Sequence, residues 1–316
     1  MLRALFFGTP AFAVPCLDAL ASIAEVRGVV CQPDKPQGRG LALAPPPVKM
    51  RALELGFPVS QPTKLRNGEF AAWMKAQEVD VALVVAYGRI LPQDVLDAPR
   101  LGCVNVHASL LPRYRGAAPI TWAIVRGEKE TGVTLMKMDA GMDTGDMLEQ
   151  ARLTIGDDET AGELSLRLAA LGADLVVKNL PRFLTGTYVA EKQDDARATL
   201  APILKKEDGL VRWDMPAQAV HDHVRGMAPW PGAAVRFRGK TLKIHTTKLA
   251  TFGRAAAPGT VVLADKTGVF VACAEGTVEL VTVQPEGKKP VRGAEWVMGR
   301  GVAEGDVLSE ASAPTG

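Results

Sequence analysis

The 316-residue sequence contains few aromatic side chains and few cysteines, and both shortages limit the classes of protein it can be. Aromatic residues make up 5% of the chain, so its cores are expected to be mainly aliphatic. The four cysteines form no C-x-x-C pair, which disfavours zinc ribbons and thioredoxin-like chemistry. Cys31, Cys103 and Cys273 lie in apolar segments and are expected to be buried thiols. The fourth, Cys16, falls on a predicted helix.

Long apolar runs and nucleotide-binding motifs are also missing. No run approaches the roughly 20 residues that a membrane-spanning helix needs. The N-terminal segment reaches Gly8–Pro10 too soon for a signal peptide and has no cleavage site. Neither G-x-G-x-x-G after the first strand nor the Walker pattern is present, which disfavours a phosphate cradle. Because the sequence shows neither a signal peptide nor a membrane-spanning run, we expect a cytoplasmic protein.

Acidic residues are absent from residues 223–264. The same stretch contains seven basic residues: Arg225, Arg236, Arg238, Lys240, Lys243, Lys248 and Arg254. Scattered Lys and Arg commonly form no more than a solvated face. Basic residues interleaved with rings such as Phe237 and Phe252 also suit a surface that follows a nucleic-acid backbone.

Hydrophobic patterning predicts two domains, in line with a prior of roughly 150 residues per domain. The first half alternates strands with helices, which is typical of a largely parallel, Rossmann-like α/β sheet. Its predicted strands are 3–7, 26–31, 79–86, 102–106 and 132–138, and its predicted helices are 11–22, 47–56, 68–77, 117–126 and 160–183. After one helix at 216–227, short β-like runs at 233–238, 241–249, 259–264, 268–273 and 277–283 predict a small β-barrel. We therefore predict a first domain over 1–184, an exposed linker over 185–204, a barrel domain over 205–308 and a disordered tail over 309–316.

Asn105 and His107 end an apolar strand, and the segment Leu101–Pro119 continues into a loop rich in Pro, Arg and Gly. In an extended strand, residues two positions apart project from the same face. An Asn and a His at a strand end, joined by Asp143 from another strand, can perform acid–base work on a carbonyl and stabilise an oxyanion. The alternative for His107 is a structural histidine.

Asp143 lies in the acidic, glycine-containing segment Asp139–Asp146. The segment could be a simple turn, and it could also be a partial metal loop. It is too short for calcium and has no distal bidentate acid, so we expect no metal. Asp139 and Asp146 are expected to act as local turn and cap residues. An Asp beside His107 would fix the imidazole tautomer and stabilise the charged ring.

Several long motifs occur in an order that resembles the methionyl-tRNA formyltransferase family across nearly the whole chain. They include Phe7–Pro10, Gln32–Gly40, Val85–Gly88, Leu101–Pro119, Glu130–Asp146, Pro229–Pro231 and Gln284–Lys289. Ala108 stands where that family usually has Gly, which adds one methyl group beside the strand end.

The resemblance implies the fold, the co-substrate and the site residues. It implies that Asn105, His107 and Asp143 are catalytic and that the barrel is of the oligonucleotide-binding (OB) kind. It also implies a binding segment for 10-formyltetrahydrofolate, where leucines would cover the pterin face. The residues expected there are Ser109, Leu110, Leu111, Pro112, Val85, Tyr87, Gly88, Ile90, Leu91 and Asp139.

Residues 32–47 form a long excursion with five prolines, and the resemblance implies that it orders against the acceptor end of tRNA. The alternative is a floppy excursion without a role. With the basic stretch, it completes the predicted tRNA-binding set: Lys35, Arg39, Lys205, Lys206, Arg236, Arg238, Lys240, Lys243, Lys248, Lys288 and Lys289.

The resemblance thus implies formyl transfer from 10-formyltetrahydrofolate to the amine of initiator Met-tRNA. We expect a monomeric protein that needs no metal. Three alternatives stay open at this stage. One is a formyltransferase acting on a small amine, such as a glycinamide ribonucleotide or an amino sugar. Another is a hydrolase that releases formate from the same co-substrate. The third is a nucleic-acid-binding module on an idle catalytic scaffold.

Overall fold

The structure, a computed structural model, describes residues 2–37, 42–66, 68–185 and 188–309. The chain divides into two compact units that interleave along the sequence. The first comprises Met1–Pro119, Glu130–Leu153 and Ser165–Pro202, and the second comprises Ile120–Lys129, Thr154–Leu164 and Ile203–Gly316. Two short segments from the first half of the sequence therefore belong to the second unit.

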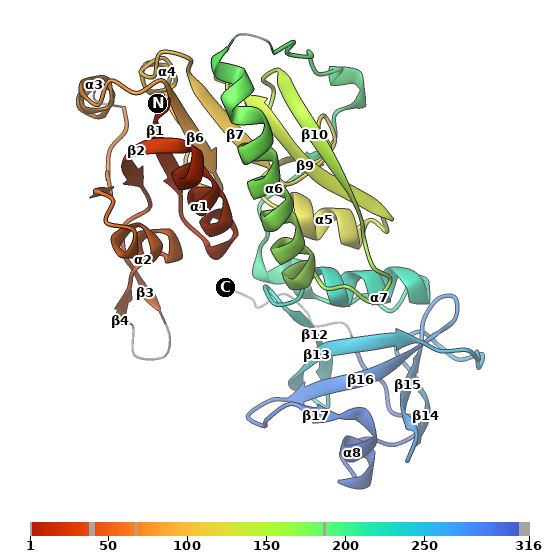
Figure 1. Ribbon diagram of the computed structural model, residues 1–316. Coiled ribbons are helices and arrows are strands. Elements are labelled where there is room, and N and C mark those ends of the chain that lie inside the picture. Colours follow the sequence, from red (N-terminus) through yellow and green to blue (C-terminus); the bar gives the residue numbers. More distant parts are fainter. Residues whose placement is uncertain (1, 38–41, 67, 186–187, 310–316) are drawn as a thin grey trace. The chain divides into compact units, whose positions relative to one another are not determined.

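The first unit is built on a sheet with seven strands in the described residues (Figure 1). In spatial order these are β10 (Met147–Thr154), β9 (Glu130–Lys137), β7 (Cys103–His107), β6 (Val81–Val85), β1 (Leu2–Gly8), β2 (Ala24–Val30) and β5 (Val59–Ser60). The strands β7, β6, β1, β2 and β5 run parallel to one another, whereas β9 runs antiparallel to β7. The predicted Rossmann-like, largely parallel sheet is confirmed.

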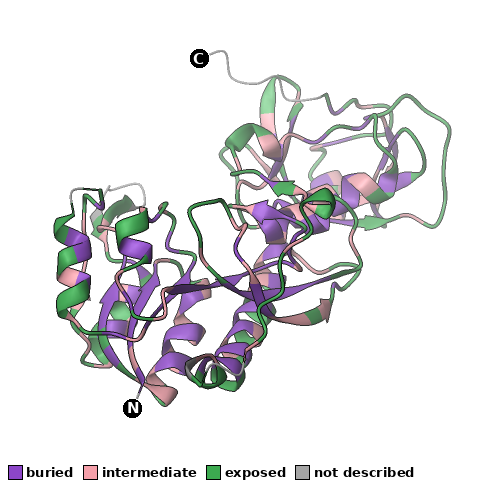
Figure 2. Cartoon of the chain, turned by 90° about the horizontal axis from the view of Figure 1, so that it is seen from above, coloured by how far each residue is buried: buried purple, intermediate pink, exposed green. Residues whose placement is uncertain are grey.

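Both faces of this sheet are covered, which explains why its central strands are apolar along their whole length. One face packs against α3 (Glu69–Ala76) and α4 (Gln93–Leu96), which contribute Phe70 and Val95 to a core with Phe7. On the other face, Gly172 of α6 (Ala161–Leu184) approaches Cys16 of α1 (Val14–Ile23). Figure 2 shows the central strands as buried.

Most elements of this unit match the predicted ranges, including α2 (Pro47–Glu54). The helix α5 (Pro119–Val125), nearly all of which belongs to the second unit, also matches its predicted range. The strand β10 was not predicted, because its polar residues alternate only weakly with buried ones. Two described parts of the excursion 32–47 form strands, where a loop without regular structure was expected. Within it, β3 (Lys35–Gln37) pairs with β4 (Ala42–Ala44) in an antiparallel hairpin.

The second unit contains the predicted antiparallel sheet. Its strands are β12 (Ala233–Phe237), β13 (Lys240–Leu249), β16 (Thr277–Pro285), β15 (Gly268–Ala272) and β14 (Val261–Asp265), with β17 (Val291–Arg292) paired to β16. The helix α7 (Ala217–Gly226) packs on this sheet and places Val220 and Val224 in its core. A second helix, α8 (Gly293–Met298), buries Trp296 in the same core.

The end of the chain closes the gap between the outer strands β12 and β14. Ser309 exchanges two backbone hydrogen bonds with Arg236 of β12, each 3.0 Å long. On the other side, the Leu308 amide donates to the Gly259 carbonyl and the Val261 amide of β14 donates to the Asp306 carbonyl, both at 2.8 Å. The sheet thereby closes into a barrel. Assigning Ser309 to the disordered tail was wrong, and the rest of that expected tail lies outside the described residues.

Candidate active site

Asn105 and His107 lie on β7, where their side chains are largely buried. They are 9% and 6% exposed, and both point to one side of the strand because they are two residues apart. Asn105 pairs in register with Val84 of β6 and Met136 of β9, so the site lies in the middle of the sheet. The strand stops at His107, and the chain there turns away from the sheet.

The two ring nitrogens of His107 face different acceptors. Nε2 lies 2.9 Å from the carbonyl oxygen of Tyr114, and Nδ1 lies 3.6 Å from Oδ2 of Asp143. A carbonyl oxygen can only accept, so Nε2 carries the proton of this hydrogen bond. In the neutral ring, the lone pair is therefore on Nδ1, next to the carboxylate. His107 and Asp143 meet as the sequence predicted.

The Asp143 carboxylate faces His107 and is also held by a backbone amide. The Gly116 amide donates to its Oδ2 at 2.8 Å. Asp143 adopts a φ of 56°, a left-handed conformation that Asp tolerates better than most residues. No sequence pattern indicates that Tyr114 and Gly116 hold the site, because backbone donors and acceptors have no residue signature.

The segment Ser109–Pro112 forms a rigid wall next to His107. The Ser109 hydroxyl donates to the Arg113 carbonyl at 2.6 Å, and the Thr134 hydroxyl donates to the Ser109 carbonyl at 2.7 Å. Gln150 donates to the Leu111 carbonyl at 2.8 Å. Thr134 and Gln150 were not identified from the sequence. Ser109, Leu111 and Pro112 are buried, whereas Leu110 is partly exposed.

In the segment after β6, only some of the predicted cofactor-binding residues are exposed. The Tyr87 ring is buried against Phe7, with centroids 5.4 Å apart, and Val85 and Leu91 are also buried. Gly88 is exposed, and Ile90 is 77% exposed. A ligand at this edge would therefore meet Gly88 and the Ile90 side chain.

The Tyr87 carbonyl is already used within the protein, as is the carboxylate of Asp139. Thr9 donates to the Tyr87 carbonyl at 3.0 Å and Gln32 donates at 3.2 Å. Asp139 accepts from the Gly141 amide at 3.0 Å and from the Thr144 hydroxyl at 2.7 Å. The expected turn role of Asp139 is confirmed.

All predicted tRNA-binding side chains within the described residues are exposed. They are Lys35, Lys205, Lys206, Arg236, Arg238, Lys240, Lys243, Lys248, Lys288 and Lys289. Arg39 lies outside the described residues. On β13, Lys243 alternates with the buried Leu242 and Ile244, so its charge faces outward from the barrel.

The acid-free stretch acquires acidic neighbours once the chain folds. Arg225 is buried and pairs with Asp222 at 2.6 Å, so it contributes no surface charge. Two exposed cations also find partners from a later segment. Arg238 pairs with Asp306 at 2.9 Å, and Arg254 pairs with Glu304 at 3.1 Å.

Lys240 and Arg236 lie near another acid, Glu286. The Thr241 amide donates to Glu286 at 2.9 Å and holds the pKa of that carboxyl below its usual range, with Lys240 and Arg236 contributing. Lys243 and Lys248 are therefore better candidates than Lys240 for an accessible cationic surface.

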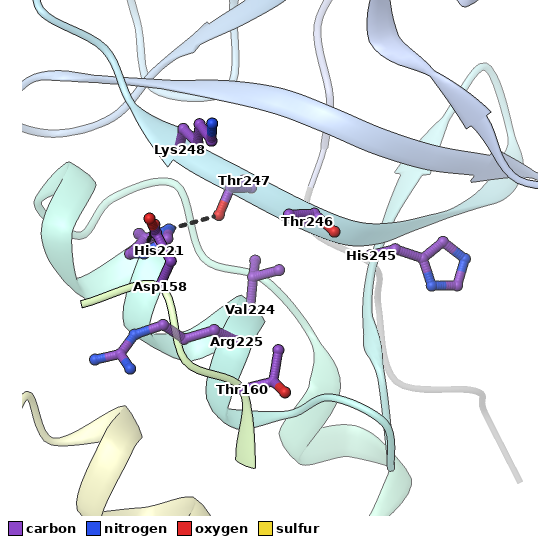
Figure 3. Close-up of a pocket in the computed structure, with 9 residues that line it drawn as sticks. All are labelled: Asp158, Thr160, His221, Val224, Arg225, His245, Thr246, Thr247 and Lys248. Carbon is purple, nitrogen blue, oxygen red and sulfur yellow. Dashed lines mark hydrogen bonds and ion pairs between the residues drawn. The ribbon is translucent and has the colours of Figure 1, made fainter. Parts of the chain in front are cut away.

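A second polar cluster surrounds the buried His221 of α7 (Figure 3). Its Nδ1 lies 3.0 Å from the Thr247 hydroxyl, and its Nε2 lies 3.2 Å from the Asp157 carbonyl and 3.3 Å from Oδ1 of Asp158. The adjoining hollow has a volume of about 80 Å³, too small for a ligand the size of folate. We interpret His221 as a structural tie between the segment 154–164, α7 and β13.

Two further features are absent from the described ranges of the chain. No three His, Cys, Asp or Glu side chains in those ranges stand together as a metal site. None of the helices in those ranges is both long and apolar enough to cross a membrane.

Comparison with known proteins adds to this geometry. Residues 2–180 match the family described as formyl transferase, and residues 203–301 match its C-terminal domain. The chain is 57% identical to the methionyl-tRNA formyltransferase of Sorangium cellulosum, over 97% of this chain and 99% of that protein. It is 51% identical to the methionyl-tRNA formyltransferase of Deinococcus radiodurans, over 96% of this chain and 94% of that protein.

Solved structures with lower sequence identity share the fold. An N-formyltransferase from Helicobacter canadensis, in complex with folinic acid and dTDP-3-aminofucose, is 18% identical with a TM-score of 0.67, covering 90% of this chain and 100% of that one. HypX from Aquifex aeolicus, in complex with tetrahydrofolic acid, is 17% identical with a TM-score of 0.63, covering 99% of this chain and 51% of that one. At these identities the likeness shows the fold alone.

Proposed function

The chain belongs to the methionyl-tRNA formyltransferase family, and from that premise we propose that it formylates the α-amine of methionine on initiator tRNA. The formyl donor is 10-formyltetrahydrofolate, which supplies an activated formyl carbon on a nitrogen that departs. The observation that carries the proposal is the pairing of His107 with Asp143 at the end of β7, beside Asn105.

His107 acts as the proton carrier in this proposal. Its Nε2–H is committed to the Tyr114 carbonyl, so Nδ1 holds the lone pair that accepts the proton of the attacking amine. Proton uptake makes the ring positive only 3.6 Å from the Asp143 carboxylate, which stabilises that charge. The same Nδ1–H can then return the proton to the departing nitrogen.

Asn105 stabilises negative charge on the formyl oxygen. Its amide can donate two hydrogen bonds, and it lies on the same side of β7 as His107. When His107 is charged, its Nδ1–H can also donate to that oxygen, because its Nε2–H is bonded to the Tyr114 carbonyl. A fixed donor in a largely buried site stabilises a developing oxyanion better than water does, because the donor need not reorient. The amine of methionine is itself the nucleophile, so no covalent enzyme intermediate is needed.

The edge of the sheet offers apolar side chains to a folate-sized ring. The strands β6 and β7 are parallel neighbours, so the segments that follow them leave the sheet at the same edge. Ile90 is exposed after β6, and Leu110 is partly exposed after β7. Two apolar side chains at one edge can cover a pterin, while backbone groups near Gly88 read its polar rim. We place the co-substrate there, with the predicted residues from Val85 to Leu91 and Ser109 to Pro112.

The tRNA is proposed to contact the hairpin and the outward cations of the barrel. Lys35 lies on β3 and is exposed, and Lys243 and Lys248 are exposed on β13. Such contacts are electrostatic and largely independent of base sequence. We further propose that the protein acts as a monomer in the cytoplasm, where initiator tRNA is used.

One assay separates this function from its alternatives. Purified protein is mixed with 10-formyltetrahydrofolate and Met-tRNA, and both formylmethionyl-tRNA and formate are measured. Formylated tRNA without excess formate supports the proposal, and formate alone indicates a hydrolase. Absence of both products contradicts any formyl-transfer role with this acceptor. A parallel reaction with glycinamide ribonucleotide or an amino sugar should yield no formylated amine, because neither has the RNA backbone that the hairpin and barrel cations are proposed to bind.

A further inference from the structure

The segment 188–202 enters the catalytic region, although its polarity predicts an exposed connector. Of residues 191–197, all of which the structure describes, Gln193 alone is not exposed. The segment is docked on both sides of this residue. Glu191 exchanges backbone hydrogen bonds with Met147 at 2.8 Å, and β11 (Leu200–Ala201) pairs with β8 (Arg115–Gly116).

Both the nitrogen and the oxygen of the Gln193 side-chain amide are hydrogen-bonded. Its Nε2 donates to the carbonyl oxygens of Asp143 and Gly145, both at 2.8 Å. Its Oε1 accepts from Arg115, at 3.0 Å from Nε and 2.8 Å from Nη2. A guanidinium only donates and a carbonyl only accepts, so the orientation of the Gln193 amide is unambiguous. The Arg115 side chain is 9% exposed, and Asp195 also accepts from it at 2.7 Å.

These contacts hold the turn that carries Asp143. The left-handed backbone of Asp143 is unfavourable for a residue with a side chain, and it persists only where the surroundings enforce it. Gln193 binds the carbonyls on either side of Thr144, which fixes the direction of the turn. The Gly116 amide, adjacent to Arg115, binds the carboxylate itself at 2.8 Å.

The same segment also supports His107. The Thr199 hydroxyl accepts from the Tyr114 amide at 2.9 Å, and the Thr199 carbonyl accepts from the Arg115 amide at 2.9 Å. Tyr114 in turn supplies the carbonyl that fixes the His107 tautomer. Both members of the His107–Asp143 pair are thus held from this one segment.

We propose that Gln193 is a positioning residue for the reaction, acting through Asp143. It sets the backbone at Asp143 so that the carboxylate faces Nδ1 of His107. This inference rests on the proposed formyl transfer and on the roles given to His107 and Asp143. It predicts an effect on turnover rather than on binding of either substrate, because Gln193 contacts the supporting turn and not the reacting atoms.

The test replaces Gln193 with Glu. Ionised Glu keeps the shape and the acceptors for Arg115, but it cannot donate to the two carbonyls. The kcat for formylmethionyl-tRNA should fall about 10- to 100-fold, the range for misplacing a catalytic group by about 1 Å. The KM values of Gln193→Glu for tRNA and for the folate should stay within about twofold of the wild-type values. The control is Lys192→Ala, which changes an exposed neighbour, and its kcat and both KM values should also stay within about twofold of wild type. Gln193→Met, which removes all four hydrogen bonds without adding a charge, should show the same selective loss of kcat.

A double-mutant cycle separates positioning from a general structural role. In an Asp143→Ala background, Gln193→Met should cost less than about twofold in kcat, since the residue through which it acts is gone. An equal loss in both backgrounds would overturn the inference, as would wild-type kcat in Gln193→Glu. A wild-type protein that makes no formylmethionyl-tRNA would instead overturn the proposed function, and this role with it.

Discussion

Replacing Asp143 with Asn isolates the charge beside His107. The two side chains have the same shape, and Asn can still accept the hydrogen bond from the Gly116 amide. Only the negative charge is lost, 3.6 Å from Nδ1 of His107. The Asp143 and His107 side chains are 17% and 7% exposed, so solvent screens the pair only partly.

The expected magnitude follows from this distance. Two unit charges at that separation interact by roughly 4–5 kcal/mol at an effective dielectric constant of about 20. At about 1.36 kcal/mol per factor of ten, this corresponds to about three orders of magnitude in rate. Both charges are delocalised, which increases their mean separation and lowers the value. We therefore expect Asp143→Asn to reduce kcat by about 10²- to 10³-fold, with little change in either KM.

The assay measures formylmethionyl-tRNA at saturating co-substrate and tRNA, alongside the thermal unfolding midpoint. Asp146→Asn is the matched control, because Asp146 lies in the same turn and its hydrogen bond to Lys137 uses the backbone carbonyl. It should keep wild-type turnover. If folded Asp143→Asn retains more than about a fifth of wild-type kcat, the charge of Asp143 does not stabilise His107 in the reaction.

The remaining predictions concern the hairpin, the barrel surface and the thiols. Trypsin should cut the free protein after Arg39, because the bond after Lys35 precedes Pro36 and resists trypsin. The tRNA should protect the Arg39 bond, and the cut should abolish formylation while folate binding persists; full activity after cleavage would exclude a role for the hairpin. Lys243→Glu combined with Lys248→Glu should raise the KM for Met-tRNA and reduce the slope of log affinity against log salt concentration by about 0.9 per lost phosphate contact. The exposed control Lys266→Glu should change neither quantity. An unchanged KM in the folded double variant would mean that this face is only solvated. Burial raises the pKa of the Cys16 thiol to about 12, and all four cysteines are buried. Ellman's reagent at pH 8 should therefore modify the four thiols only after the protein unfolds. A fast-reacting thiol in the native protein would contradict this burial.

Local pattern in the sequence was sufficient for most of the elements and for the geometry within one strand. The apolar runs at 3–7 and 79–86 identify central strands because a sheet covered on both faces buries every residue. The strand period of two places Asn105 and His107 together without any knowledge of the fold. Family resemblance then connected Asp143 to them, although no spacing rule joins residues 36 positions apart.

Tertiary structure decided which distant groups meet. Gln193 lies 50 residues after Asp143 in a polar stretch, and its amide finds the Asp143 carbonyl only because the segment 188–202 folds back onto the sheet. The charges of Arg238 and Arg254 gain partners for the same reason, because the 304–309 segment returns to the barrel. Periodicity and turn preference report contacts within a few residues. Hydrogen bonds to backbone carbonyls and ion pairs across the fold depend on the order of strands, which no local pattern encodes.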